Sequence, residues 1–319
     1  MIEGNVNEDD VLLYAQRLYF NNLTEGEPID KIDDELNEAD TSKGREFIEN
    51  FSLELEESFK NLYRFYKVDS DVYAIHSLIQ LGRIGLVMPF ILKAYKFNID
   101  KDTMAVLCKS FESLVLRHRV IGTRADIILR INDTFKNFTQ EDTDTSVQSI
   151  VARINTLKES DSEEDPYMSH WNSNALKKAL QEGIKAENAK FILWKYENFL
   201  CSQGKPGYKE KRFTDIEKPQ LEHIAPQHPR SATPEKDGYA KYDDIFIRNY
   251  LNCIGNYLLL SGYHNQSLSN DPFDKKRQTY TKLEQQREVF EMTKEKKIWG
   301  VREIKKRRNK IIAFVLENF

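Results

Sequence analysis

The sequence has few cysteines, and those present are far apart. Its 319 residues contain three, Cys108, Cys201 and Cys253. An odd number of separated cysteines argues against a disulfide framework. The chain also has no Cys-x-x-Cys pair, which excludes a zinc knuckle of the usual kind. Any metal bound by this chain is therefore expected to use oxygen and nitrogen ligands.

Long apolar runs are missing as well. No stretch approaches the ~20 apolar residues that cross a bilayer. The acidic first ten residues, MIEGNVNEDD, lack the apolar core of a secretory signal. Hydrophobic residues make up 40% of the chain and charged residues 31%, as in ordinary globular proteins. We therefore expect a cytoplasmic protein that does not associate with membranes.

Glycine and proline are scarce, with 13 and 9 residues respectively, and few of the prolines lie before residue 204. This scarcity favours long helices. Apolar residues recur at helical spacing through 47–66 and again through 75–81, without a convincing alternating strand pattern. The chain is long enough for two domains. We therefore predict a mainly α fold that begins with a helical domain over residues 1–204.

Charge is distributed unevenly along the chain, although the net charge is only −4. Residues 1–70 carry 7 Lys and Arg against 18 Asp and Glu, a balance of −11. Residues 275–310 carry 14 Lys and Arg against 5 Asp and Glu, a balance of +9. A basic end is a weak indication of a nucleic-acid partner. Two solvated helical faces of opposite sign explain the same pattern equally well.

The character of the sequence changes after residue 204. Prolines bracket 219–226, which favours a short strand there, and a polar loop rich in Pro, Gly and Asp follows. A second strand is predicted at 257–260. Asp271-Pro272 is typical of a helix start. The order strand, long loop, strand, helix predicts a ββα unit with flanking helices, in a second domain over residues 205–319.

Two motifs in this region carry chemistry. The first is Glu222-His223-Ile-Ala-Pro-Gln227, and the second runs from Gly255-Asn256 to Asn265, which follows Asn256 by nine residues. Together they resemble the HNH branch of the His-Me finger nucleases, whose ββα-metal fold has an acidic residue and a His on the first strand. The segments 269–273 and 275–280 are similar to the C-terminal nuclease half of GmrSD-type modification-dependent restriction enzymes.

The resemblance assigns roles to four residues. It implies that His223 is the general base, that Glu222 and Asn265 are metal ligands, and that Asn256 holds the loop and orients the base. A neutral imidazole titrates in the range needed to deprotonate water. One divalent cation, Mg²⁺ or Mn²⁺, prefers oxygen ligands and keeps several waters. No nucleotide cofactor is implied for this chain.

Basic residues near the motifs are candidates for phosphate contacts. Lys275, Lys276 and Arg277 open the final helical region, and His264 precedes the predicted ligand Asn265. Such contacts give affinity that depends on salt but not on sequence. A charged helix face explains the three basic residues equally well, and a solvated side chain explains His264.

The predicted function is hydrolysis of phosphodiester bonds in DNA, in defence against phage or modified foreign DNA. GmrSD-type enzymes pair such a nuclease with a ParB-like domain that hydrolyses nucleotide, which this sequence does not display. The resemblance therefore implies a separately encoded ParB-like NTPase subunit or a fused upstream domain. Two alternatives remain: an RNA-cleaving nuclease, and a non-catalytic or regulatory subunit of a restriction complex that binds nucleic acid or protein.

Overall fold

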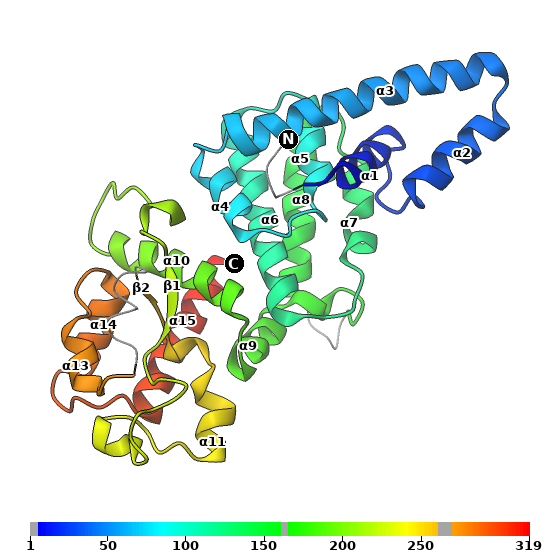
Figure 1. The fold of residues 1–319 in the computed structure, drawn as a ribbon. Coiled ribbons are helices and arrows are strands. Elements are labelled where there is room, and N and C mark those ends of the chain that lie inside the picture. Colours follow the sequence, from blue (N-terminus) through cyan, green and yellow to red (C-terminus); the bar gives the residue numbers. More distant parts are fainter. Residues whose placement is uncertain (1–5, 161–164, 261–269) are drawn as a thin grey trace. The chain divides into compact units, whose positions relative to one another are not determined.

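The computed structural model describes residues 6–160, 165–260 and 270–319 (Figure 1). The chain forms two compact units. The first comprises residues 1–115 and 123–172, and the second comprises residues 116–122 and 173–319. Helices dominate both units, as the sequence predicts.

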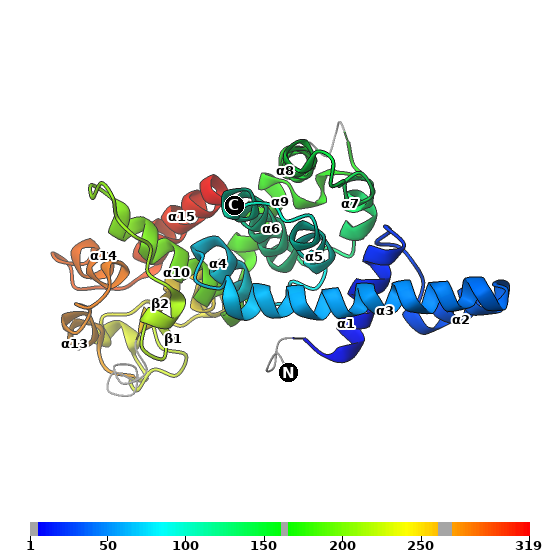
Figure 2. The same cartoon turned by 90° about the horizontal axis from the view of Figure 1, so that it is seen from above.

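The first unit is helical throughout its described part. Its helices, in chain order, are α1 (Glu8–Tyr19), α2 (Pro28–Glu38), α3 (Thr41–Tyr63), η1 (Arg64–Val68), α4 (Tyr73–Leu81), α5 (Met88–Lys96), the first part of α6 (Lys101–Ile121), α7 (Ile127–Lys136), α8 (Thr143–Glu159) and η2 (Ser169–Trp171). Figures 1 and 2 show α2 and the first half of α3 running side by side as a hairpin.

Local sequence explains where several of these helices begin. Asn7, Asp40, Asp126 and Asp142 stand at the N-caps of α1, α3, α7 and α8, and each side chain accepts a hydrogen bond from a backbone N–H of the first turn. Such caps satisfy N–H groups that have no partner inside the helix.

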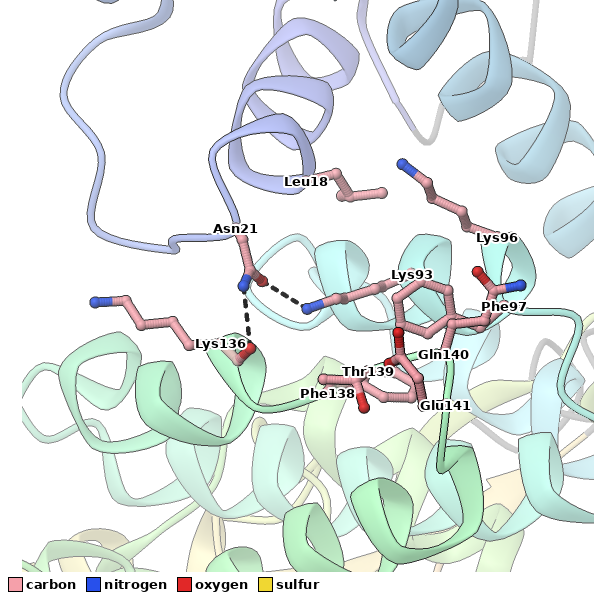
Figure 3. Close-up of a pocket in the computed structure, with 10 residues that line it drawn as sticks. All are labelled: Leu18, Asn21, Lys93, Lys96, Phe97, Lys136, Phe138, Thr139, Gln140 and Glu141. Atoms are coloured by element: carbon pink, nitrogen blue, oxygen red, sulfur yellow. Dashed lines mark hydrogen bonds between the residues drawn. The ribbon is translucent and has the colours of Figure 1, made fainter.

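A pocket of about 320 Å³ lies in the first unit, with Lys93 in its wall (Figure 3). The Lys93 ammonium donates to Asn21 Oδ1 and to the carbonyl of Phe135, both at 2.6 Å. Burial, and secondly the charge of Lys96, lower the pKa of Lys93 to about 8. The amino groups of Lys96 and Lys136 point away from Lys93. The three cations therefore do not converge on one ligand position, and Lys93 links α5, the end of α7 and the residues after α1.

The second unit contains the predicted strands. Its elements, in chain order, are the last residues of α6, α9 (Ser173–Glu182), α10 (Ala186–Ser202), η3 (Phe213–Asp215), β1 (Gln220–His223), η4 (Pro234–Asp237), α11 (Asp244–Phe246), η5 (Ile247–Leu251), η6 (Ile254–Asn256), β2 (Tyr257–Leu260), α13 (Phe273–Gln278), α14 (Glu284–Met292) and α15 (Val301–Asn318). Both strands lie where the sequence places them. The helices α9 and α10, which the sequence places in the N-terminal domain, belong to this compact unit.

The two strands pair antiparallel, with Glu222 opposite Leu258 and His223 opposite Tyr257. All four residues of β2 are buried, as expected for a strand covered on both faces. At Leu259 the backbone N–H donates to Gln285 Oε1 at 3.1 Å, and the carbonyl accepts from Gln286 Nε2 at 3.1 Å. Side chains of α14 therefore satisfy the backbone of β2 at this position.

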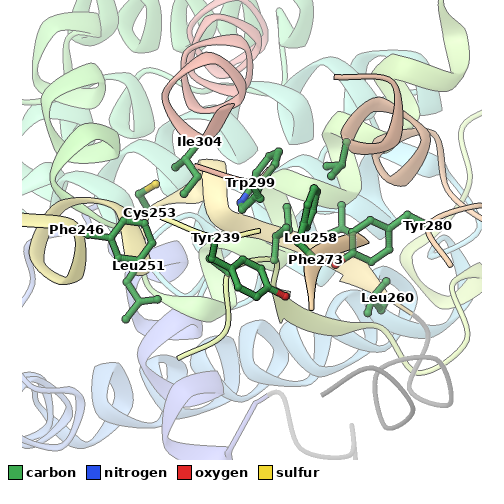
Figure 4. Packing of buried hydrophobic residues seen from close by; sticks show 13 residues of the cluster. Tyr239, Phe246, Leu251, Cys253, Leu258, Leu260, Phe273, Tyr280, Trp299 and Ile304 are labelled. Carbon is green, nitrogen blue, oxygen red and sulfur yellow. The ribbon is translucent and has the colours of Figure 1, made fainter. Parts of the chain in front are cut away.

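A hydrophobic core packs beneath the strands (Figure 4). Trp299, which precedes α15, is fully buried, and its ring centroid lies 5.9 Å from that of Phe273 at the start of α13. Tyr239 from the long loop lies against the same Phe273 ring. This core fixes α13 and the loop between the strands relative to β2, and so fixes the residues at the end of β1.

Candidate active site

His223 is the last residue of β1, where the strand ends before Pro226. Its ring is partly exposed and meets the ring of Tyr257 edge-on, with the centroids 4.8 Å apart. Its Nε2 atom lies 3.0 Å from Oδ1 of Asn252. Burial lowers the pKa of His223 below its usual value, the Asn252 hydrogen bond opposes this shift, and the charge of Lys276 adds to it. The lowered pKa favours the neutral imidazole, which is the form a general base requires.

Glu222 makes its contacts on the other side of the strand. Its side chain is buried, and Oε1 accepts from the ammonium of Lys276 on α13. Burial raises the pKa of the Glu222 carboxyl, and the Lys276 ammonium counteracts that rise. Lys276 is itself fully buried and also donates to the carbonyl oxygens of His223, at 3.1 Å, and Ile224, at 3.4 Å. It thus fastens the end of β1 to α13.

Neighbouring residues on a strand point to opposite faces. Glu222 and His223 follow this rule in their contacts, because the first meets Lys276 and the second meets Asn252. Both side chains can therefore serve one site only if β1 twists or ends here. The strand does end at His223, and Lys276 contacts the Glu222 carboxyl and the His223 backbone carbonyl, but among the described residues no contact joins the Glu222 carboxyl to the His223 ring.

Asn256 is completely buried, and its side chain makes four hydrogen bonds. Its Oδ1 accepts from the Ala225 N–H and from Trp299 Nε1, both at 2.9 Å. Its Nδ2 donates to the carbonyls of Ala225, at 3.0 Å, and Leu251, at 2.9 Å. These contacts tie the residues after β1 to the turn before β2, which is the arrangement that a loop-holding residue requires.

The other predicted site residues have different environments. Asn265 and His264 lie outside the described residues. Lys275 is exposed and forms an ion pair with Asp271 at 2.9 Å. Lys276 and Arg277 are buried, the first against Glu222 and the second with its Nε 2.8 Å from Asp274 Oδ1. Of the three basic residues proposed for phosphate contacts, only Lys275 presents its side chain to solvent.

Sequence reasoning missed Asn252, and it missed the role of Lys276 as the partner of Glu222. Asn252 follows η5 and lies 29 residues from His223 in the chain. It belongs to neither motif, and a single sequence offers no signal for a contact across such a loop. A lysine in a basic run is expected at the surface, so its burial depends on how α13 packs.

Among the described residues, Glu222 is the one predicted ligand that could bind a divalent cation. Within the part of the chain that the structure describes, no three His, Cys, Asp or Glu side chains group as a metal centre would require. The Oε2 atom of Glu222 receives no hydrogen bond from any described residue, so its lone pairs can face a cation, although Lys276 already places positive charge at Oε1. A hard cation that keeps several waters needs few protein oxygens. Its second expected ligand, Asn265, lies outside the described residues.

No helix in the described part of the chain is long and apolar enough to span a bilayer.

Comparisons with known proteins identify the family of the chain. No curated protein and no solved structure matches the chain. The family model described as GmrSD restriction endonucleases, C-terminal domain, matches residues 129–314, which is more than half of the chain and includes both strands and every described residue of the site. The chain therefore belongs to the GmrSD restriction endonuclease family, as a protein carrying its C-terminal domain.

Proposed function

We propose that the second unit is a metal-dependent HNH endonuclease that hydrolyses phosphodiester bonds in DNA, in defence against phage or modified foreign DNA. The observation that carries this proposal is the placement of His223. Its imidazole, whose pKa is lowered, lies at the end of β1, next in sequence to the buried Glu222, in a chain of a restriction endonuclease family. The order β1, long loop, β2 and then α13 among the described residues is consistent with the proposed ββα-metal unit.

In the proposed reaction, His223 takes a proton from a water molecule through its unprotonated ring nitrogen. The water oxygen forms a bond to phosphorus as the bond from phosphorus to the 3′ oxygen breaks. When bound, Mg²⁺ or Mn²⁺ supplies positive charge beside the departing oxygen. Glu222, through Oε2, and Asn265 are the residues that would hold it. Asn256 keeps the backbone after His223 in place through its bonds to Ala225.

The basic segment 275–310 supports a nucleic-acid substrate. Lys275 is exposed at the start of α13, on the same helix as the Lys276 that contacts Glu222 and His223. Phosphate contacts by such side chains add affinity that falls as salt rises. The separately encoded ParB-like NTPase, or a fused upstream domain, stays a prediction for the complete system.

The test uses the full chain with plasmid DNA, phage DNA carrying modified bases, and RNA. Each substrate is incubated with Mg²⁺ or Mn²⁺ and then with EDTA. We expect metal-dependent cleavage of DNA that disappears in His223→Ala. His228→Ala is the matched control, because His228 is exposed and lies only five residues away.

Four outcomes would contradict the proposal. Equal cleavage by wild type and His223→Ala would show that His223 is not the general base. Cleavage that persists in EDTA would show that the reaction does not require a divalent cation. Cleavage of RNA alone would favour the RNA-cleaving alternative, and no cleavage of any substrate by a folded chain would favour the non-catalytic one.

A further inference from the structure

We propose that Asn252 is a positioning residue that holds His223 in a single tautomer, with the proton on Nε2, so that Nδ1 is the nitrogen that accepts the proton of the attacking water. This inference rests on the proposed function and names the atom that carries it out. Neither sequence motif includes Asn252.

The hydrogen bonds around Asn252 determine which ring nitrogen carries the proton. Oδ1 of Asn252 lies 3.0 Å from His223 Nε2 and accepts at 3.4 Å from both Gln227 Nε2 and the Tyr257 hydroxyl. Three groups that can donate therefore surround one amide oxygen, which identifies that atom as the acceptor. An amide oxygen has no proton to give, so in the neutral ring the proton must lie on Nε2.

The opposite nitrogen is then left as the base. A neutral imidazole has one donor and one acceptor nitrogen. No residue in the described ranges forms a hydrogen bond to Nδ1 of His223. Its lone pair is available to a water molecule, and the partly exposed ring allows that water to approach.

Asn256 holds both sides of the Asn252–His223 contact. Its Nδ2 binds the carbonyl of Leu251, the residue before Asn252. Its amide also binds Ala225, two residues after His223, through both the backbone N–H and the carbonyl. A buried side chain thus joins the two backbone segments, so that the exposed Asn252 side chain is held near the ring without being buried itself.

Further contacts fix the rest of the histidine. The Tyr257 ring lies edge-on, with an interplanar angle of 73°, and limits rotation of the imidazole. Lys276 donates to the His223 carbonyl and fixes its backbone. With the backbone and the ring plane set by these neighbours, the Asn252 hydrogen bond is the contact left to select the tautomer.

The first measurement is the tautomer itself. Long-range ¹⁵N–¹H spectra of the histidine-labelled full chain, recorded above the titration range of imidazole, distinguish the two neutral forms, and His223→Ala assigns the signal. We expect the Nε2–H form in wild type. In Asn252→Leu, which keeps the side-chain size but removes the acceptor, we expect a mixture of the two forms.

The second measurement is turnover. We expect cleavage by Asn252→Leu to fall about tenfold, the value of one ordinary hydrogen bond, and to fall in kcat rather than in KM. Asn252→Asp keeps an acceptor oxygen, and we expect it to restore the Nε2–H tautomer and most of the turnover. Asn249→Leu is the matched control, since Asn249 is an exposed asparagine three residues earlier, and it should leave both measurements unchanged.

The outcomes separate this inference from the proposed function. An Nδ1–H ring in wild type, or Asn252→Leu with wild-type tautomer and turnover, would overturn the inference even if His223→Ala is inactive. Equal cleavage by wild type and His223→Ala would overturn the proposed function. In that case the spectra would still show whether Asn252 sets the tautomer, although the role of Nδ1 as a base would be lost.

Discussion

The side-chain amide of Asn256 pairs with the backbone of Ala225 in the way a neighbouring strand would, accepting from its N–H at 2.9 Å and donating to its carbonyl at 3.0 Å. Asn256 thereby continues the sheet for one step beyond the end of β1. The same side chain reaches Leu251 and Trp299, so one buried amide joins the end of β1, the turn carrying Asn252 and the start of α15.

Replacing Asn256 by Ala should cost about 3 kcal/mol or more in the free energy of unfolding. The change leaves several buried donors and acceptors unpaired, and each costs about 1–3 kcal/mol. Urea denaturation measures the loss. Asn249→Ala, at an exposed position, should change stability by no more than about 0.5 kcal/mol. Equal midpoints for the two variants would show that the Asn256 bonds add no stability.

Gly255 lies where α15 approaches the turn before β2 most closely. A Cβ on Gly255 would lie 2.8 Å from the Arg308 Cβ and 2.9 Å from the Arg308 backbone nitrogen. We expect Gly255→Ala to destabilise the chain by about 1–3 kcal/mol, as overpacking does. Gly26→Ala is the control, because nothing lies within 4 Å of its Cβ position. Thermal unfolding of Gly255→Ala at the wild-type temperature would contradict this packing.

Glu222 and Lys276 should behave as a coupled pair. Lys276→Met leaves a buried carboxylate without its partner, which costs about 3–5 kcal/mol. The double variant Glu222→Leu with Lys276→Met should recover much of that loss, because no buried charge remains. Lys275→Met, on the exposed neighbouring residue, serves as the control. Losses that simply add in the double-mutant cycle, measured by urea denaturation, would rule out the coupling.

The buried side chain of Lys93 should make the stability of the folded chain depend on pH. Its pKa is lowered to about 8 in the folded chain from 10.5, because burial disfavours the ammonium. The unfolded chain therefore binds more protons between these pH values, and the stability of wild type relative to Lys93→Met should rise with pH across that window. Below pH 8 Lys93 is protonated in both the folded and the unfolded chain, so its unfavourable contribution to stability is fully present. A difference in unfolding free energy that falls or stays flat over the window would contradict the shift.

The sequence by itself determined much of the second unit. The strands at 220–223 and 257–260 were predictable because prolines and polar turns delimit short apolar segments. His223 and Asn256 stood out as candidate site residues because they match the resembling family's motifs in residue type and spacing. The long helices of the first unit follow from helical periodicity and from the scarcity of proline, which are local properties of the chain.

Only the tertiary structure decided which side chains meet. Lys275 and Lys276 are adjacent and chemically identical, yet one is exposed and the other buried. Successive residues of a helix are rotated by roughly 100°, so the packing of α13 against β1 selects Lys276 as the partner of Glu222. The Asn252–His223 contact spans 29 residues. It exists because Asn256 draws two backbone segments together, an outcome of packing that no local pattern encodes.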